Sequence, residues 1–344
     1  MEIASSLLTW YQANKRVLPW RIYKDPYLVW ISEIMLQQTR IEAVIPYYER
    51  FLKRLPNIKA LAEVEEDELL KLWEGLGYYN RARNLKKAAQ IIQEEYHGVF
   101  PSTYEEILRL PGIGEYTASA IASICFDEKT PTVDGNVLRV YTRLLEDRRC
   151  IDFDRVKKEI RLEIQEIMPD HFPGDFNEAF MELGEVVCLP KGDPKCDLCP
   201  LRNCCGSYLH QTWNQYPVKL EKKEKKELFY TVFLFTCHGR IAIQKRTDEG
   251  LLKNLWEFPN QLGKRKISEV KNDLAEKHID YVQVQKSGSH KHVFSHQIWH
   301  MQAYLIEFKE EIKPFLWVMP KELKETYAIP GAFQSFLEIL LHTI

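Results

Sequence analysis

Residues 110–144 read LPGIGEYTASAIASICFDEKTPTVDGNVLRVYTRL, and this stretch decides the fold of the chain around it. Apolar residues at helical spacing end at Leu110 and resume at Tyr116, so we interpret the PGIG segment between them as a helix-hairpin-helix turn. Gly112 and Gly114 let the backbone approach a phosphate, and the next helix begins with free N–H groups that attract an anion. The pattern favours contact with a DNA backbone, although a Gly-x-Gly turn by itself fits an ordinary helix connection equally well.

Asp134 follows an extended segment and precedes the next helical pattern. Pro131-Thr132-Val133 is typical of extended chain, and Val137, Leu138 and Tyr141 form an apolar stripe, so we predict Asp134 at or next to a helix N-cap. An aspartate in this place is usually only a cap. However, the helix dipole and the N–H groups also hold a carboxylate ionised at neutral pH. A fixed carboxylate behind a phosphate-binding hairpin could stabilise a positive charge on a sugar of the bound DNA.

The segments LPGIGEYTASAIA and TVDGNVLRV resemble the helix-hairpin-helix, Gly-Pro, Asp superfamily of base-excision DNA glycosylases. The rest of the chain narrows the resemblance to the MutY family of adenine DNA glycosylases, over nearly the whole length. The resemblance implies an all-α helix-hairpin-helix glycosylase domain with an iron-sulfur loop, followed by an α+β Nudix-like domain. The expected boundaries are 1–210 for the first domain, with the hairpin at about 105–125 and the iron-sulfur loop at 188–205, then 211–227 for a linker and 228–344 for the second domain.

Length and composition agree with a soluble protein of two domains. The 344 residues suffice for two cores, and 45% hydrophobic and 28% charged residues are ordinary values for a globular chain. A net charge of -2 excludes an overall polycation, so binding to nucleic acid has to rest on local patches. Neither a secretory signal nor an apolar run of about 18 residues is found. We therefore expect a cytoplasmic protein without membrane contact, in a bacterium and on the nucleoid when DNA is bound, and a monomer.

Glu33 lies in the apolar part of a long helical pattern over residues 27–55, which we expect to break near Pro46. A carboxylate there is either at an exposed helix edge or partly desolvated with a raised pKa, and the residues alone favour the exposed edge. The resemblance reverses this preference, because Glu33 in SEIMLQQT matches the catalytic glutamate of the family. A raised pKa suits a general acid that protonates a purine near neutral pH. Gln38 and Thr39 follow on the same expected helix and, by resemblance, contact the base pair at the lesion.

The resemblance also assigns residues to the base pocket and to an inserted loop. Trp20, Arg21, Asn177 and Glu178 match pocket positions, although Trp20 fits equally well as an anchor of the N-terminal helix and Glu178 as an exposed helix charge. In the loop GLGYY, Leu76 and Tyr78 match residues that fill the space of the extruded nucleotide. Without the resemblance, the basic and aromatic residues there favour a solvated helix face after a glycine turn.

Tyr116 separates two possible reactions. Relatives that also cut the strand, which resemble endonuclease III, carry a lysine at this position and form a Schiff base with the sugar. A tyrosine cannot do so, and we therefore predict a monofunctional glycosylase. We expect Tyr116 to form hydrogen bonds at the catalytic centre and Asn136 to orient water or a carboxylate.

Four cysteines, Cys188, Cys196, Cys199 and Cys205, follow the pattern C-x7-C-x2-C-x5-C. Four thiolates in so short a stretch favour a 4Fe-4S cluster over zinc, whose four-cysteine sites usually pair two separated C-x2-C knuckles. The family usually has six residues in the first gap, and Cys204 is an alternative fourth ligand. We expect the cluster to hold a DNA-contacting loop, with nearby basic side chains at Lys191, Lys195 and Arg202, and not to perform redox chemistry.

A charged run, VKLEKKEKKE, is typical of a solvated linker, and period-two strand patterns follow it. The strands resemble a Nudix fold, but the glutamate-rich helix that binds magnesium in Nudix hydrolases is missing, so pyrophosphatase activity is not expected. Phe294, Ser295 and His296 lie between two strands and form an ordinary turn set. By resemblance they match the Phe-x-His loop that reads 8-oxoguanine.

The implied reaction removes adenine paired with 8-oxoguanine or guanine in double-stranded DNA. Glu33 protonates the adenine, and Asp134 stabilises the oxocarbenium-like sugar or bonds to it transiently before water adds. The product is an abasic site in an intact strand. Two alternatives stay open: a bifunctional glycosylase-lyase, which Tyr116 disfavours, and a non-catalytic iron-sulfur protein that only recognises lesions.

Overall fold

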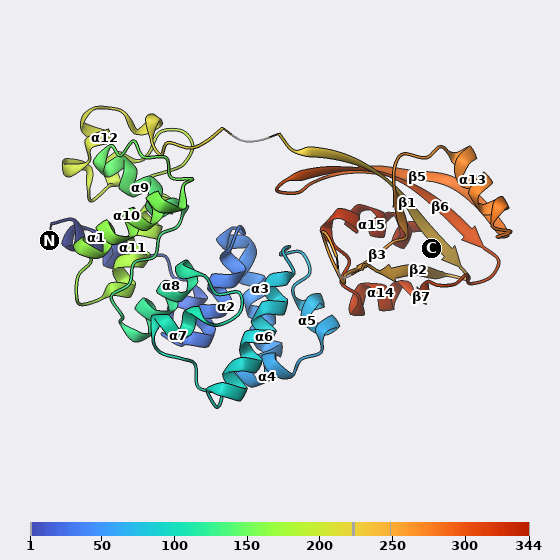
Figure 1. Cartoon of the computed structure of the whole chain (residues 1–344), viewed down its shortest axis with the longest axis horizontal. Coiled ribbons are helices and arrows are strands. Elements are labelled where there is room, and N and C mark those ends of the chain that lie inside the picture. Colours follow the sequence, from blue (N-terminus) through green and yellow to red (C-terminus); the bar gives the residue numbers. More distant parts are fainter. Residues whose placement is uncertain (1, 222–223, 248, 344) are drawn as a thin grey trace. The chain divides into compact units, whose positions relative to one another are not determined.

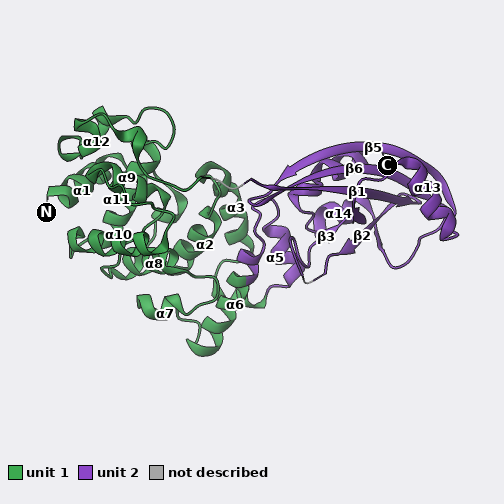
Figure 2. Ribbon diagram, turned by 45° about the horizontal axis from the view of Figure 1, so that its top comes forward, with its two compact units in different colours: residues 1–63, 84–221 green, residues 64–83, 222–344 purple. Residues whose placement is uncertain are grey.

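A computed structural model describes residues 2–221, 224–247 and 249–343, and the chain divides into two units (Figures 1 and 2). The first unit comprises residues 1–63 and 84–221, and the second comprises residues 64–83 and 222–344. No helix in the described part of the chain is long and apolar enough to cross a membrane.

The first unit is helical, as predicted. Its helices lie on both sides of the PGIG turn in the sequence. They are α1 (Glu2–Asn14), α2 (Pro26–Leu36), α3 (Ile41–Arg54), α4 (Ile58–Glu63), α6 (Asn80–Glu95), α7 (Tyr104–Leu108), α8 (Glu115–Phe126), α9 (Gly135–Leu145), α10 (Asp154–Ile167), α11 (Pro173–Val186) and α12 (Gly206–Leu209), with a short η1 (Pro19–Arg21) before α2.

Three helices that are distant in sequence form one core. α1, α9 and α11 pack together and bury Leu7, Tyr11, Val137, Phe176 and Phe180. Full burial of such a side chain stabilises a fold by about 1.5–3 kcal/mol. α8 contacts both α2 and α11, so the helices that carry the predicted catalytic residues are packed against one another.

The helical pattern over residues 27–55 breaks at a different position from the one predicted. α2 ends at Leu36, Gln38 has a left-handed φ of 60°, and α3 begins at Ile41. α3 then continues through Pro46. The proline costs the helix one hydrogen bond, but the burial of Val44, Tyr48 and Phe51 on either side of it stabilises the helix. Gln38 and Thr39 therefore lie in a turn after α2 and not on the helix of Glu33.

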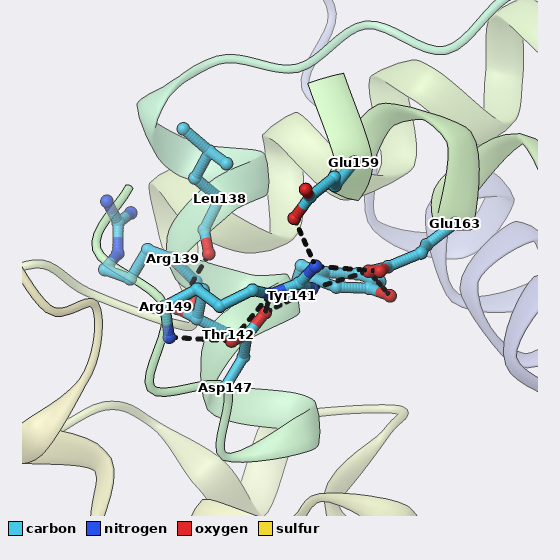
Figure 3. A network of polar contacts seen from close by, with 8 residues as sticks. All are labelled: Leu138, Arg139, Tyr141, Thr142, Asp147, Arg149, Glu159 and Glu163. Carbon is cyan, nitrogen blue, oxygen red and sulfur yellow. Dashed lines mark hydrogen bonds and ion pairs between the residues drawn. The ribbon is translucent and has the colours of Figure 1, made fainter. Parts of the chain in front are cut away.

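A polar network fixes the C-terminal end of α9 to α10 (Figure 3). The Arg149 guanidinium lies 2.6 Å from Asp147 Oδ2, 2.8 Å from Glu163 Oε2 and 3.2 Å from Glu159 Oε2. Tyr141 Oη also donates to Glu163 Oε2, over 2.8 Å. The guanidinium lowers the pKa of Glu163, so the network is ionised at neutral pH. It holds the far end of the helix whose first turn follows Asp134.

The second unit is an α+β domain, which confirms the expected class. Seven strands are described, in the sheet order β3-β2-β1-β6-β5, with β4 paired to β1 and β7 paired to β2. β1 and β6 pair in parallel, and β5 and β6 form an antiparallel hairpin. The strands are β1 (Lys226–Cys237), β2 (Arg240–Lys245), β3 (Trp256–Glu257), β4 (Asn260–Leu262), β5 (Tyr281–Val293), β6 (Gln297–Phe308) and β7 (Leu316–Val318), with helices α5 (Glu66–Leu72), α13 (Ile267–Glu276), α14 (Pro320–Thr326) and α15 (Gln334–Thr343).

Alternating side chains of β1 reach two different cores. Val232 and Leu234 pack with residues of α14 and α15, whereas Phe233 and Phe235 pack with residues of α13. This is the period of two that places successive strand residues on opposite faces of a sheet. Helices therefore cover both faces of the sheet.

Residues 64–83 pack with the C-terminal unit, which the sequence did not indicate. α5 contacts α14 within this unit. In the predicted linker, Leu220 N donates to Asp152 Oδ2 over 2.7 Å and β1 begins at Lys226, while residues 222 and 223 lie outside the described residues. The predicted domain boundaries stay a prediction.

Candidate active site

A cavity of about 340 Å³ opens between η1, α2, α8, α11 and the start of α9, all in the first unit. It brings together the predicted catalytic and adenine-pocket residues that the sequence places on separate elements. Its lining consists of Arg16, Leu18, Trp20, Arg21, Val29, Ser32, Glu33, Leu36, Gln38, Thr39, Arg40, Ile41, Tyr116, Ile124, Asp134, Asn136, Glu178, Met181, Glu182 and Glu185. Asn177 is absent from this lining.

Glu33 is buried and not at an exposed helix edge, with 7% of its surface accessible. Burial raises its pKa to about 7; the Tyr116 hydroxyl opposes this shift, and the carboxyl groups of Glu178 and Asp134 add to it. Within the described residues, its buried Oε2 has no hydrogen-bond partner. Glu33 can therefore carry a proton at neutral pH and present it to a ligand in the cavity.

Asp134 is the N-cap of α9, as predicted. Its Oδ1 accepts from Val137 N over 2.7 Å, and its Oδ2 accepts from Asn136 Nδ2 over 3.0 Å. Burial nevertheless raises the pKa of Asp134 above its ordinary value, and the bonds from Val137 and Asn136 offset only part of this effect. The sequence indicated the cap, which favours the ionised form, but not the burial, which opposes it.

Asn136 is held by contacts that the sequence analysis missed. Its Oδ1 accepts from Arg139 Nη2 over 2.9 Å, and the same nitrogen donates to Gly184 O over 2.7 Å. A Cβ at Gly184 would lie 2.6 Å from Asn136 Cβ, so only glycine allows α9 and α11 to approach here. In the sequence, the only indication of this close approach is a glycine within a helical pattern, Gly184 in MELGEVV, and its partner Asn136 lies far away in the chain.

One wall of the cavity is a network of ion pairs. Arg21 lies 3.0 Å from Glu178 Oε1 and 2.9 Å from Glu182 Oε2, and Arg16 lies 2.6 Å from Glu182 Oε1. Tyr11 Oη donates to Glu178 Oε2 over 2.8 Å. Burial raises the pKa of Glu178, against the effect of Arg21 and Tyr11. Arg21 and Glu178 thus line the same cavity as Glu33, and so do Arg16 and Glu182, which the sequence did not indicate.

Trp20 and Tyr116 each combine two roles. Trp20 lines the cavity and also packs edge-on against Tyr48 of α3, with ring centroids 5.3 Å apart. Tyr116 lines the cavity, and its hydroxyl donates to Met181 Sδ over 3.1 Å. Residue 116 is therefore a tyrosine without an amino group that could react with a sugar.

The PGIG segment forms the expected turn between α7 and α8. Gly112 has a φ of 77°, and a Cβ there would lie 2.5 Å from Asn84 Cβ, so this position requires glycine. Gly114 is the N-cap of α8 with extended backbone, and nothing lies within 4 Å of a Cβ built on it. The free N–H groups of the first turn of α8 follow directly.

The residues predicted to read the opposite base lie in the second unit. Phe294, Ser295 and His296 join β5 to β6, and Phe294 packs edge-on against Trp299 at 4.8 Å between centroids. Tyr78 is half exposed, and its hydroxyl is hydrogen-bonded to Ser295 Oγ. Leu76 is buried, with 6% of its surface accessible. Of the two predicted loop residues, Tyr78 is thus exposed and Leu76 is buried.

The four predicted cluster cysteines line one cavity of about 30 Å³, together with Arg143. Cys204 does not line it; its thiol donates to Leu201 O over 3.3 Å. Arg143 Nη1 lies 3.3 Å from Cys188 Sγ. Burial raises the pKa of Cys199 to about 12, and the thiols of Cys188, Cys205 and Cys196 add to the shift. A bound metal favours the thiolate form of its cysteine ligands.

No group of three His, Cys, Asp or Glu side chains among residues 2–221, 224–247 and 249–343 is arranged around a single metal ion. In an iron-sulfur cluster, each cysteine binds a different iron, so its thiols need not converge on one point. Four cysteine thiols that line one cavity are the type of donor set that iron-sulfur clusters use.

Comparison with known proteins decides the family. Residues 31–169 match the HhH-GPD superfamily base excision DNA repair protein family, and residues 231–338 match the NUDIX domain. An adenine DNA glycosylase of Buchnera aphidicola subsp. Schizaphis graminum is 38% identical, over 97% of this chain and 97% of its own. The chain belongs to the adenine DNA glycosylase family. Members of this family hydrolyse N-glycosyl bonds in base excision repair.

Two further relatives agree with this membership. The mouse adenine DNA glycosylase is 34% identical, over 87% of this chain and 69% of its own. The solved structure of a thermostable thymine-DNA glycosylase is 29% identical with a TM-score of 0.55, and it covers 60% of this chain and 95% of its own. The expected family and the helical and Nudix-like fold are thereby confirmed.

Asn177 of this glycosylase supports Asp134 from behind. Its Oδ1 accepts from Thr132 N over 3.0 Å, and its Nδ2 donates to Thr130 O over 2.9 Å and to Ser123 Oγ over 2.8 Å. The side chain is almost fully buried, with 2% accessible. Asn177 therefore holds the extended segment that leads into Asp134, and it does not contact the ligand cavity as the resemblance implied.

We predict that Asn177→Ala slows adenine excision at least about tenfold, because small misplacements of a catalytic group are costly. The same change should lower the free energy of unfolding by about 2–4 kcal/mol, since it leaves buried backbone groups without partners. Single-turnover rates and urea denaturation measure the two effects, with the exposed Asn214→Ala as control. Loss of stability with an unchanged rate contradicts the positioning role.

Proposed function

We propose that this glycosylase removes adenine paired with 8-oxoguanine or guanine and leaves the DNA strand intact. The observation that carries the proposal is the presence of two carboxyl groups in one cavity: Glu33, buried with a pKa of about 7, and Asp134, the N-cap of α9. A base that leaves the stack loses stacking energy, and this loss is smaller for a mispair.

Each carboxyl group has a separate task in the proposed reaction. The protonated Glu33 donates from Oε2 to the adenine ring, which makes the base a neutral leaving group. Asp134 stabilises the positive charge that develops on the sugar, or bonds to it transiently, before water adds. Asn136, oriented by Arg139, positions Asp134 or the water. Tyr116 has no amine for a Schiff base, so the sugar stays attached to an unbroken strand.

The base opposite the adenine is read by the second unit in this proposal. Phe294, Ser295 and His296 stand at the end of the β5–β6 hairpin, where a loop can enter a base stack. The hydrogen bond of Tyr78 to Ser295 supports joint action of the two loops. DNA is the expected partner, while a cytoplasmic location and a monomeric state stay predictions.

We further propose that Cys188, Cys196, Cys199 and Cys205 hold a 4Fe-4S cluster. When bound, the cluster supplies structural cross-linking of residues 188–205 and no redox step. The thiols and Arg143 fix this segment to the end of α9, so that Lys191, Lys195 and Arg202 are presented to DNA phosphates.

The choice between Cys205 and Cys204 gives a test of this cluster. Cys205→Ser should lose most of its iron and its visible absorbance, because Cys205 lines the shared cavity, whereas Cys204→Ser should keep both. Iron content per purified chain measures the difference. Equal iron in both variants contradicts the assignment of Cys205.

The proposed reaction is tested with duplex DNA that holds one adenine opposite 8-oxoguanine. Under single-turnover conditions, each sample is divided and analysed with and without alkali. Strand cleavage only after alkali is the expected result. Cleavage without alkali indicates a lyase, and bound but intact DNA in both halves indicates a protein that only recognises lesions.

A further inference from the structure

Glu74 binds the C-terminal part of the second unit through its carboxylate. Oε1 accepts from the backbone N–H of Ile329 over 2.8 Å and from Gln334 Nε2 over 3.1 Å. Oε2 lies 2.6 Å from Lys71 Nζ, which also donates to Tyr327 O over 3.0 Å. The segment between α14 and α15 is thus bound to residues that precede it by more than 250 positions in the chain.

The contact of Glu74 with the C-terminal segment is partly buried, and its partner residues are themselves hydrogen-bonded. The side chains of Lys71 and Glu74 are only 21% and 19% exposed. Gln334 donates a second hydrogen bond, to Ile329 O over 2.8 Å, so the acceptor carboxylate faces a preformed turn. A charged acceptor with several donors forms stronger hydrogen bonds than a neutral one.

Glu74 immediately precedes the loop that carries Leu76 and Tyr78. This loop is held from inside by its own neighbours: Trp73 Nε1 donates to Gly77 O over 3.1 Å, and Arg81 Nη2 donates to Leu76 O over 2.8 Å. Because the loop is fixed internally, its position follows that of Glu74.

The far end of the same loop has its own contact with the C-terminal part. Tyr78 is hydrogen-bonded to Ser295, which lies in the turn between β5 and β6. The loop is therefore bound at two points, at Glu74 to the α14–α15 segment and at Tyr78 to the turn that contains Phe294 and His296. Both points belong to the unit made of residues 64–83 and 222–344.

We propose that Glu74 is a specificity-determining positioning residue, which couples the base opposite adenine, read at residues 294–296, to the placement of Leu76 and Tyr78. Glu74 contacts no reacting atom in this role. It keeps the loop in register with the reading turn, so that a correct opposite base favours the loop position needed for extrusion of the adenine. This inference rests on the proposed function.

Four single variants and one double variant test the coupling. Glu74→Ala removes every bond of the carboxylate, and Glu74→Gln keeps an acceptor for Ile329 N but loses the charge that pairs with Lys71. Gln334→Ala weakens the same contact from the opposite side. The exposed Glu325→Gln on α14 is the matched control.

The measured quantity is the ratio of single-turnover excision rates for adenine opposite 8-oxoguanine and opposite guanine. Glu74→Ala should reduce this ratio about five- to tenfold, as expected for a coupling between two sites, with the rate opposite guanine changed by no more than about twofold. Glu74→Gln and Gln334→Ala should give smaller reductions of the same sign, and Glu325→Gln should give none. The double variant Glu74→Ala, Gln334→Ala should lose less than the product of the single losses, because the two side chains share one contact.

Affinity for duplexes with an uncleavable adenine analogue opposite each base gives a second readout, which does not need catalysis. A wild-type protein that binds the 8-oxoguanine duplex more tightly but never excises adenine contradicts the proposed function, and the affinity ratio then tests the coupling. Equal losses on both duplexes, or an unchanged ratio in Glu74→Ala, overturn the role of Glu74. A wild-type protein that does not distinguish the two duplexes by rate or affinity overturns it as well.

Discussion

Glu33→Gln should reduce the single-turnover rate of adenine excision by about 10²–10⁴-fold, the usual contribution of a general acid. Glutamine has the size of glutamate but cannot donate the proton that the leaving purine needs. The exposed Glu42→Gln, in the first turn of α3, is the matched control and should excise at the wild-type rate. A Glu33→Gln protein that excises adenine as fast as the wild type removes Glu33 from the mechanism.

The pH dependence of the rate gives an independent test of the same assignment. Since burial raises the pKa of Glu33 to about 7 and the protonated form is the active one, the wild-type rate should fall as pH rises above 7. Glu33→Gln has no such proton, so its residual rate should lack this decline. A wild-type rate that stays constant from about one unit below to about two units above pH 7 contradicts a titrating acid at this position.

Glu33→Gln should change stability in the opposite direction to activity. The folded pKa of Glu33 lies above its ordinary value of 4.5, so the native state holds the proton more tightly and loses stability as pH rises from the ordinary pKa to about 7. Above that pH the cost is constant, roughly 3 kcal/mol at most. Glu33→Gln avoids ionisation in the buried site, so at pH 8 it should be more stable than the wild type by up to that amount in urea denaturation.

Local sequence patterns correctly predicted the features that depend only on neighbouring residues. The cap at Asp134 depends on its neighbours, and the turn at Gly112 depends on a positive φ that glycine favours, so both were found. The helix break after Leu36 was missed, because Pro46 is a stronger breaker by rule than the left-handed Gln38. The raised pKa of Asp134 depends on burial, which no local pattern contains.

Contacts between distant elements account for most of what the sequence did not predict. Asn177 supports Thr132 across 45 residues, and Arg139 reaches Gly184 across 45 residues. The resemblance placed Asn177 in the pocket, but its bonds lie behind the catalytic segment. Glu74 contacts Ile329 across 255 residues, and nothing in either local sequence marks the pair.

Asp134→Asn should lower the excision rate by about 10²–10³-fold while leaving the fold intact. The loss follows from removing a preorganised negative charge from the place where the sugar becomes positive. Asparagine is as good an N-cap as aspartate, so the bond from Val137 N can persist and the free energy of unfolding should stay nearly unchanged. Single-turnover kinetics and urea denaturation of the same preparation measure both quantities.

Asp134→Ala separates the cap from the charge. This variant loses both, so its excision rate should match that of Asp134→Asn while its free energy of unfolding falls by about 1 kcal/mol. The two variants should keep a decline of rate with rising pH, because Glu33 still supplies the proton, but the decline should begin at lower pH, because the Asp134 charge no longer raises the pKa of Glu33. If Asp134→Asn instead excises adenine at nearly the wild-type rate, Asp134 acts only as a cap, and the sugar cation has to be stabilised by another group of the cavity.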